Sequence, residues 1–306
     1  MLGIETIATY IPEARKSNYD LKEKFEIEND FIENKIGVKY HAIKDKGFKS
    51  SDMCVKAFEN LHYNSNINLE EIECCIVVTQ NPDLNIPHTS AIVHGKLGLS
   101  STCAAFDISL GCSGYVYGLS NIISFMKNNG MKKGLLFTSD QYSDIIDEDD
   151  KNTALLFGDA ATVTLISEDP TYIPIDFSFG TNGKEYKELI NKDKLYMNGR
   201  AVFNFTATTA PKHIKALLEK NNLDDTNIMK YYLHQGSKYI VDTIRKRLKV
   251  DEQKVPFDMA EYGNTVSSSI PIILAKDIKN TPKGKIVLSA FGVGLSWASA
   301  IIEKIK

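Results

Sequence analysis

The sequence has 306 residues, which is enough for one large domain or for two of about 150 residues each. Hydrophobic residues make up 43% and charged residues 25%, as is typical of a soluble globular protein. The net charge of -3 gives no indication of nucleic acid or an anionic membrane as a partner, and no apolar run approaches the roughly 20 residues of a membrane helix.

Cysteine usage and the N-terminus indicate the compartment. The five cysteines are an odd number without C-x-x-C spacing, which argues against a disulfide framework or a zinc site. The first ten residues, M-L-G-I-E-T-I-A-T-Y, lack the basic and apolar regions of a signal peptide. We therefore expect a cytoplasmic protein that holds no metal ion.

Apolar runs of strand length alternate with helical patterns along the first half. The predicted strands cover residues 1–10, 72–79, 104–110, 134–138 and part of 155–167. The predicted helices cover residues 19–35, 53–61 (with Ser50, Ser51 and Asp52 as candidate N-caps), 89–97 and 113–128. Fully apolar strands are typical of buried parallel sheets, so the pattern predicts an α/β protein with mainly parallel pairing.

A cysteine occupies the turn between the strand at 104–110 and the helix that follows it. Cys112 would lie at a helix N-terminus, where free backbone N–H groups and the positive end of the helix dipole stabilise a thiolate. This position makes Cys112 a candidate nucleophile. The alternative is that Cys112 is a buried small residue, as most free cysteines are.

The second half repeats features of the first half in the same order. The paired segments are 72–80 with 229–235, F-D-I-S-L-G-C at 106–112 with F-D-M-A-E-Y-G-N at 257–264, and Lys-Gly at 133–134 with Lys-Gly at 283–284. A nearly constant offset of about 150 residues favours a duplicated unit over a chance likeness between strands. We expect the halves to be 1–168 and 169–306, divided in the S-E-D-P segment.

The duplication predicts which residues lie near Cys112, because equivalent strand ends of the two halves would face one another. His234 ends an apolar strand, and Asn264 lies in Y-G-N-T just before an apolar helix at 267–278. Histidine is the usual proton partner of a catalytic cysteine. For Asn264 the alternative is a turn or N-cap role.

Several motifs are specific for one family when they are taken together. They are D-I-S-L-G-C-S-G, H-Q-G-S, Y-G-N-T and A-F-G-V-G-L-S-W, with F-G-D-A-A at 157–161 and I-G-V at 36–38. The chain resembles, over essentially its whole length, the β-ketoacyl-acyl carrier protein synthase III branch of the thiolase-like superfamily. The resemblance implies a thiolase-like α/β fold with five layers, α-β-α-β-α, made of two duplicated βαβαβαββ halves. It also implies a homodimer.

The reaction that the resemblance implies is a decarboxylative Claisen condensation. An acyl-CoA would acylate Cys112, and malonyl-acyl carrier protein would then lose carbon dioxide and attack the thioester, giving a β-ketoacyl-acyl carrier protein. His234 and Asn264 would donate hydrogen bonds to the malonyl thioester carbonyl as charge develops on it. The backbone N–H groups of Cys112 and Val293 would form the oxyanion hole. Coenzyme A enters as a substrate thioester, and no other cofactor is expected.

The resemblance assigns three further sets of residues. Coenzyme A would contact Phe31, Lys35, Lys151, Arg200 and Ser237. The acyl pocket would contain Phe157, Phe291 and Ile86, the last reaching in from the partner subunit. An acidic carrier protein would dock on Lys212, Lys215, Arg245 and Arg247.

The sequence departs from the family pattern around the coenzyme A site. Phe31 replaces a tryptophan, Lys35 and Lys151 replace arginines, Tyr239 replaces another arginine, and Val293 replaces a glycine. These departures leave the acyl primer open.

Two other functions are compatible with the sequence. A thiolase-like acyltransferase would pass the acyl group to a hydroxyl or amine without forming a carbon–carbon bond, and it would have less need of His234 and Asn264. A non-catalytic subunit would be expected to lose Cys112. The glycine-rich segment at 291–294 lacks the G-x-G-x-x-G spacing, so we interpret it as a close-approach loop beside the active site rather than a nucleotide site.

Overall fold

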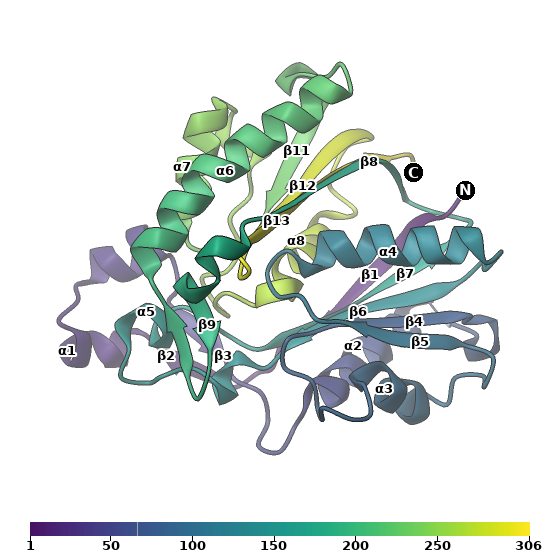
Figure 1. Ribbon diagram of the computed structural model, residues 1–306, viewed down its shortest axis with the longest axis horizontal. Helices are drawn as coiled ribbons and strands as arrows, with labels where there is room; N and C mark the ends of the chain where they lie inside the picture. Colours follow the sequence, from purple (N-terminus) through teal and green to yellow (C-terminus); the bar gives the residue numbers. More distant parts are fainter. Residues whose placement is uncertain (66) are drawn as a thin grey trace.

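The computed structural model describes residues 1–65 and 67–306. Within them a nine-stranded mixed sheet has the order β11-β12-β13-β8-β1-β7-β6-β4-β5 (Figure 1). Its strands are β1 (Gly3–Tyr10), β4 (Cys74–Val78), β5 (Ala104–Ile108), β6 (Gly134–Asp140), β7 (Ala160–Ser167), β8 (Tyr172–Thr181), β11 (Ile228–Leu233), β12 (Gly284–Gly292) and β13 (Ser296–Lys304). Two short hairpins are β2 (Arg15–Ser17) with β3 (Tyr40–Ala42), and β9 (Leu189–Asn191) with β10 (Leu195–Met197).

Helices cover both faces of this sheet and fill the space between its two parts. They are α1 (Lys22–Phe25), α2 (Ser50–Ser65), α3 (Thr89–Leu97), α4 (Gly114–Asn128), α5 (Lys151–Ala154), α6 (Gly199–Lys220), α7 (Lys238–Leu248) and α8 (Ser269–Asp277). One outer layer is α2 with α3, the other is α6 with α7, and α4 with α8 form the middle layer. The predicted five-layer arrangement is confirmed.

The middle layer is apolar because it is enclosed by sheet on two sides. Tyr115 and Leu119 of α4 share one buried cluster with Ile270 and Ile273 of α8 and with strands from both halves. Each fully buried side chain of this size contributes about 1.5–3 kcal/mol through the hydrophobic effect. Gly118 lets α4 approach the sheet, since a Cβ there would lie 2.8 Å from the Val78 side chain.

The two halves have similar but unequal topology. The first runs β1-α2-β4-α3-β5-α4-β6-β7, and the second runs β8-α6-β11-α7-α8-β12-β13, with the change between them in the loop from Ser167 to Tyr172. In the second half, residues 257–261 do not form the strand that the repeat predicts. The reason is local, because the Asp258 N–H donates to Gln235 Oε1 and the Ala260 carbonyl accepts from Lys39 and Tyr40.

Two predictions about elements are wrong. The sheet is mainly antiparallel: its antiparallel pairs are β1 with β7 and β8, β6 with β7, and β13 with β12 and β8, whereas its parallel pairs are β4 with β5 and β6, and β11 with β12. Apolar runs report burial but not strand direction, which explains the error. The predicted helix at 19–35 is divided, since Glu26 has a left-handed backbone (φ 49°) that ends α1, and a separate π-helical turn covers Phe31–Ile36.

Other boundaries differ by a few residues. The helix predicted at 53–61 begins earlier, at Ser50, so Ser50, Ser51 and Asp52 belong to the first turn of α2 and do not precede it. The helix predicted at 267–278 begins as a 3-10 turn at Val266–Ser268 and continues as α8.

Candidate active site

A cavity of about 510 Å³ opens between the two halves, and Cys112, His234 and Asn264 all line it. Each comes from a different connection: Cys112 lies between β5 and α4, His234 follows β11, and Asn264 precedes α8. The exposed fractions of the three residues are 6%, 2% and 3%. The structure therefore brings together the three residues that the repeat and the family motifs select.

Cys112 lies two residues before α4, as the sequence predicts. Burial and the nearby charge of Asp140 nevertheless raise the pKa of its thiol to about 12, against the opposing effect of the backbone N–H groups of Val293 and Cys112. The expected thiolate is therefore not the resting form, because the cost of burying a charge exceeds the stabilisation from the helix end. Cys112 rests as a thiol and loses its proton when it reacts.

The loop after β12 passes very close to this thiol. A Cβ on Gly292 would lie 2.7 Å from Cys112 Sγ, which no side chain can accommodate. The next residue, Val293, directs its backbone N–H toward the thiol. Val293 Cγ1 would lie 2.8 Å from a Cβ on Gly111, so glycines on both sides allow the two loops to meet.

His234 is held by hydrogen bonds on its inner side. Its Nδ1 lies 2.7 Å from Ser269 Oγ, and its ring packs edge-on against Phe291 with centroids 5.5 Å apart. The Gln235 N–H donates to the same Ser269 oxygen at 3.5 Å, which leaves the hydroxyl proton for Nδ1 and assigns the ring proton to Nε2. Burial lowers the pKa of His234 to about 3. His234 is therefore a neutral ring that can donate from Nε2.

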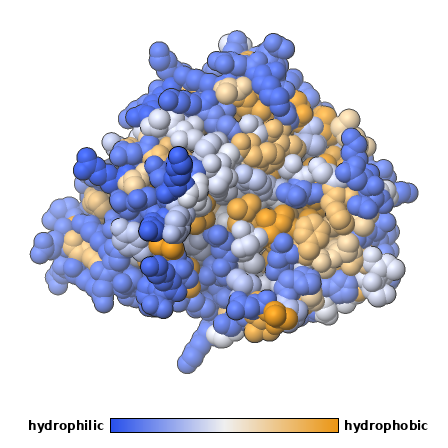
Figure 2. Space-filling view, viewed as in Figure 1, coloured by the Kyte–Doolittle hydropathy of each residue, from blue (hydrophilic) through white to orange (hydrophobic). Residues whose placement is uncertain are grey.

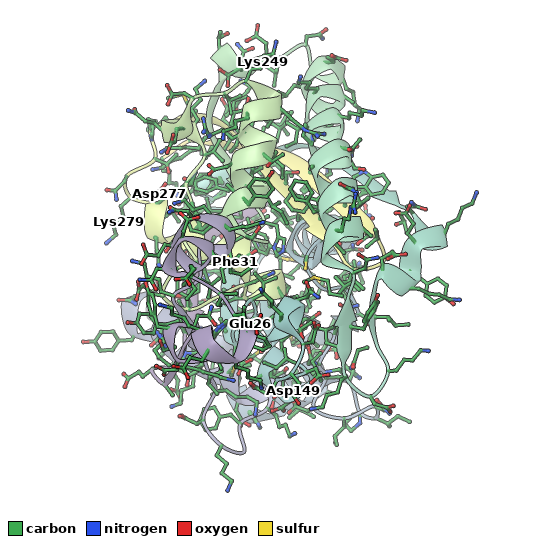
Figure 3. All side chains as sticks on the ribbon, turned by 90° about the vertical axis from the view of Figure 1, so that its left-hand side faces the viewer. Glu26, Phe31, Asp149, Lys249, Asp277 and Lys279 are labelled. Atoms are coloured by element: carbon green, nitrogen blue, oxygen red, sulfur yellow. The ribbon has the colours of Figure 1, made fainter. Side chains whose placement is uncertain are left out.

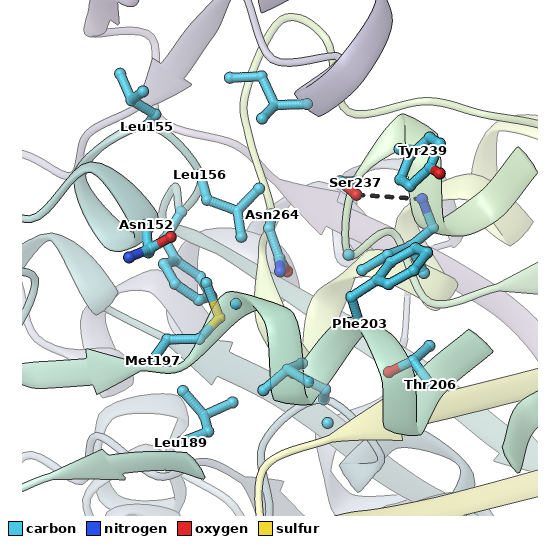
Figure 4. Close-up of a pocket in the computed structure, with 18 of the residues that line it drawn as sticks. Asn152, Leu155, Leu156, Leu189, Met197, Phe203, Thr206, Ser237, Tyr239 and Asn264 are labelled. Carbon is cyan, nitrogen blue, oxygen red and sulfur yellow. Dashed lines mark hydrogen bonds between the residues drawn. The ribbon is translucent and has the colours of Figure 1, made fainter. Parts of the chain in front are cut away.

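Asn264 is oriented by its own loop. Its Oδ1 accepts a hydrogen bond of 2.9 Å from the Val266 N–H, which leaves Nδ2 as a donor to the cavity. Its backbone pairs with the segment around Phe157, through the Asn264 N–H to the Leu156 carbonyl (2.8 Å) and the Gly158 N–H to the Asn264 carbonyl (3.0 Å). Figure 4 shows Asn264 near the middle of the cavity.

The residues expected to contact coenzyme A line the outer part of the same cavity. They are Phe31, Lys35, Lys151, Arg200 and Ser237. Lys151 Nζ lies 4.9 Å from the centroid of the Phe31 ring, and Lys35 Nζ lies 5.8 Å from it. Figure 3 shows this side, where the segment with Glu26 and Phe31 lies beside the loop of Asp149, to which Lys24 binds.

An aromatic pair at the mouth of the cavity was missed from the sequence. The rings of Phe203 on α6 and Tyr239 on α7 stack with centroids 5.0 Å apart and planes at 19° (Figure 4). We had noted Tyr239 only as a replaced arginine. The signal available for Phe203 was its place in an amphipathic segment, which predicts a helix but not a partner.

The acyl-pocket residues divide into two groups. Phe157 and Phe291 are buried and line the cavity. Ile86 lies outside it and is 87% exposed, so it takes no part in the pocket of its own subunit.

The residues expected to dock a carrier protein lie on two adjacent helices. Lys212 and Lys215 are exposed on α6, whereas Arg245 and Arg247 on α7 make contacts within the protein. Arg247 Nη1 donates to the Ala207 carbonyl at 2.8 Å, and Arg245 lies 3.6 Å from Glu252.

Two searches of the described residues gave no site of another kind. No cluster of three or more His, Cys, Asp or Glu side chains suited to a metal ion occurs among residues 1–65 and 67–306. In the same residues no helix is long and apolar enough to span a membrane.

The fold and the site define a thiolase-like enzyme that carries an acyl group on a cysteine, with a histidine and an asparagine opposite. The family model for 3-oxoacyl-[acyl-carrier-protein] synthase III matches residues 106–183, and its C-terminal model matches residues 218–304. The chain belongs to the β-ketoacyl-acyl carrier protein synthase III family, and it is an enzyme of this type.

Individual relatives agree over the whole length. The chain is 34% identical to the β-ketoacyl-acyl carrier protein synthase III of Lactococcus lactis subsp. lactis and 32% identical to that of Caldanaerobacter subterraneus subsp. tengcongensis, over 98% of this chain and 98% and 97% of theirs. The crystal structure of the synthase III from Thermus thermophilus superposes with a TM-score of 0.92 at 29% identity, covering 99% of both chains.

Proposed function

We propose that this protein catalyses the decarboxylative condensation of an acyl-CoA with malonyl-acyl carrier protein through an acyl-Cys112 intermediate. The observation that carries the proposal is the free donor on each residue opposite the thiol. His234 has Nδ1 engaged and Nε2 free, and Asn264 has Oδ1 engaged and Nδ2 free. Two neutral donors directed into one cavity suit a thioester carbonyl that becomes an enolate as carbon dioxide leaves.

In the first half-reaction, Cys112 Sγ attacks the thioester carbonyl and coenzyme A leaves with the thiol proton. The backbone N–H groups of Cys112 and Val293 hold the oxyanion of the tetrahedral intermediate. In the second half-reaction the carbon–carboxylate bond of the malonyl group breaks, and its electron pair forms the enolate that His234 and Asn264 stabilise. The enolate carbon then attacks acyl-Cys112 and releases the thiolate. The chemistry uses only side chains, backbone donors and the coenzyme A thioester itself.

Phe31, Lys35, Lys151, Arg200 and Ser237 hold coenzyme A in this proposal. Phe31 offers a ring on which a base can stack, and the three cations offer charge to phosphates. Lysines neutralise phosphate charge without the two parallel hydrogen bonds of an arginine, so we expect weaker nucleotide contacts than arginines would give. Lys212, Lys215, Arg245 and Arg247 remain the candidates for carrier-protein docking.

A homodimer through the edge of β5 is part of the proposal. Among the described residues β5 pairs on one side only, with β4, and its five residues are half-buried. Figure 2 shows apolar side chains gathered over α4 and β8, where Tyr117 packs on Phe179, which is 42% exposed. An unpaired edge beside an apolar face is a template for a second copy. We expect the enzyme to act in the cytoplasm.

The test separates the two half-reactions. The protein is incubated with a panel of acyl-CoAs and its intact mass is followed; malonyl-acyl carrier protein is then added and the ketoacyl product is measured. We expect an acyl adduct that Cys112→Ala abolishes and a product that appears only after the second addition. An adduct that survives Cys112→Ala would overturn the proposal. An adduct without a carbon–carbon product would favour the acyltransferase alternative.

A further inference from the structure

A buried carboxylate connects the two halves directly behind the active site. Asp140 ends β6 in the first half and is fully buried. Its Oδ1 accepts from the Gln80 N–H at 2.9 Å, and its Oδ2 accepts from the Ser267 hydroxyl and, at 3.4 Å, from the Ser267 N–H. Asp140 therefore binds a loop of its own half and a loop of the other half with one carboxyl group.

Both loops that Asp140 binds lead to reacting groups. The Gln80 side chain packs against Gly111, the residue before Cys112. Ser267 lies in the middle of the segment that begins with Asn264 and ends with Ser269, the hydrogen-bond partner of His234. A shift of Ser267 would therefore move the asparagine and the support of the histidine together.

This segment needs external support. Val266 has φ of 54°, a left-handed conformation that a β-branched residue adopts only when its surroundings impose it. Three consecutive serines supply different contacts: Ser267 binds Asp140, Ser268 Oγ lies 2.8 Å from Thr138 Oγ1, and Ser269 binds His234. Of the three partners, Asp140 alone carries a charge, and hydrogen bonds to a charged acceptor are the stronger ones.

We propose that Asp140 is a positioning residue for decarboxylation, which holds Asn264 and the Ser269–His234 pair opposite Cys112 through its hydrogen bonds to Ser267. The inference rests on the proposed function. It differs from a purely structural role in one respect: Asp140 is also the charged residue whose field raises the pKa of the Cys112 thiol. The other titratable groups around that thiol are Tyr142 and the cavity-lining His234.

The test uses two substitutions with different electrostatic consequences. Asp140→Asn removes the charge and places an amide donor against an N–H group, whereas Ser267→Ala removes the connection and keeps the charge. We expect both to lower the rate of malonyl decarboxylation by about 10- to 100-fold, the effect of misplacing catalytic groups by a fraction of an ångström, while Cys112 acylation is retained. Only Asp140→Asn should move the pH profile of Cys112 alkylation to lower pH.

Asp159→Asn is the matched control. Asp159 is also buried and bound by a serine, Ser143, but it is not among the groups that act on the Cys112 thiol. We expect both readouts for this variant to match the wild type. Decarboxylation within twofold of wild type in Ser267→Ala would overturn the inference, and so would an unchanged alkylation profile in a folded Asp140→Asn. If Asp140→Asn does not fold, the Ser267→Ala rate decides alone. Failure of the wild type to decarboxylate malonyl thioesters would instead count against the proposed function.

Discussion

Gly292 and Cys112 touch across the junction of the two halves, so closely that a Cβ on Gly292 would lie 2.6 Å from the Cys112 Cβ and 2.7 Å from its sulfur. Gly292 is the last residue of β12, and Cys112 precedes α4. The contact fixes the distance between the nucleophile and the Val293 N–H that is proposed to hold the oxyanion. The glycine is therefore required by space and not by an unusual backbone angle.

We predict that Gly292→Ala blocks the first half-reaction. The added methyl must displace either the thiol or the Val293 loop, so the rate of Cys112 acylation should fall by about 100-fold or more. The measurement is intact-mass kinetics with an accepted acyl-CoA. Gly95→Ala on α3 is the control, since a Cβ there would meet no heavy atom within 4 Å among the described residues. Acylation of Gly292→Ala at the wild-type rate would show that the loop moves freely.

The same junction shows what the sequence could and could not predict. The turn at Cys112 was predictable because an apolar strand, a glycine and a helical pattern are adjacent in the chain. His234 and Asn264 were reached through the internal repeat, which relates segments about 150 residues apart. Their local supports, Ser269 and Val266, lie in a run of small polar residues that carries no periodic signal.

The elements that failed did so for physical reasons. Strand direction depends on connections and not on composition, so an antiparallel β6–β7 pair has the same apolar pattern as a parallel one. Asp140 looked like an ordinary strand end, because its partner Ser267 is 127 residues away. Phe203 acquires its role only when α6 lies against α7 and Tyr239. Tertiary pairing of this kind leaves no trace in local sequence.

The buried His234 predicts how stability depends on pH. Burial lowers the pKa of His234 to about 3, below its ordinary value of 6.5, so on acidification the unfolded state takes up a proton that the folded state refuses. The resulting stability is complete above pH 6.5 and is lost as the pH falls from there toward 3. Between pH 7.5 and 5.5 the loss due to His234 is about 1.4 kcal/mol, one pH unit below the unfolded pKa.

Urea unfolding of wild type and His234→Gln at these two pH values checks this prediction. Other groups titrate in both proteins, so the comparison isolates His234. We expect the variant to lose about 1.4 kcal/mol less than the wild type on acidification. Parallel pH dependence in the two proteins would contradict the neutral, buried assignment.

Ile86 gives a prediction about the acyl group. If Ile86 enters the pocket of a partner subunit, Ile86→Ala enlarges that pocket, and the preference should shift toward longer or branched acyl-CoAs by about 10-fold in the ratio of kcat/KM values. Competition between two acyl-CoAs, read by intact mass, measures the ratio. Leu84→Ala is the control, because Leu84 is also exposed (54%) and lies two residues away. An unchanged preference would exclude Ile86 from the pocket.

The carrier-protein surface is best tested with lysines. Arg247 supports the Ala207 carbonyl, so reversing its charge would disturb α6 as well as any partner. Lys212→Glu combined with Lys215→Glu should raise the KM for malonyl-acyl carrier protein by about 10-fold and leave acylation by acyl-CoA unchanged. Lys279→Glu, on another surface, is the control. Equal effects on both half-reactions would remove this docking site.

The hydrogen bond between Ser269 and His234 gives the last prediction. Ser269 Oγ accepts from the Gln235 N–H and donates to Nδ1, so the ring proton stays on Nε2 and faces the cavity. Ser269→Ala removes this preference, and the ring can place a lone pair against the malonyl carbonyl. We therefore expect decarboxylation to fall by about 10-fold or more while Cys112 acylation is retained.

The measurement is carbon dioxide release from a malonyl thioester in single turnover, together with acylation by intact mass. Ser90→Ala is the matched control, since Ser90 is buried and its hydroxyl has no hydrogen-bond partner within the described part of the chain. Equal loss of both half-reactions in Ser269→Ala would indicate a general disturbance of the cavity. Full decarboxylation in that variant would show that His234 keeps its donor without help, and the tautomer assignment would be wrong.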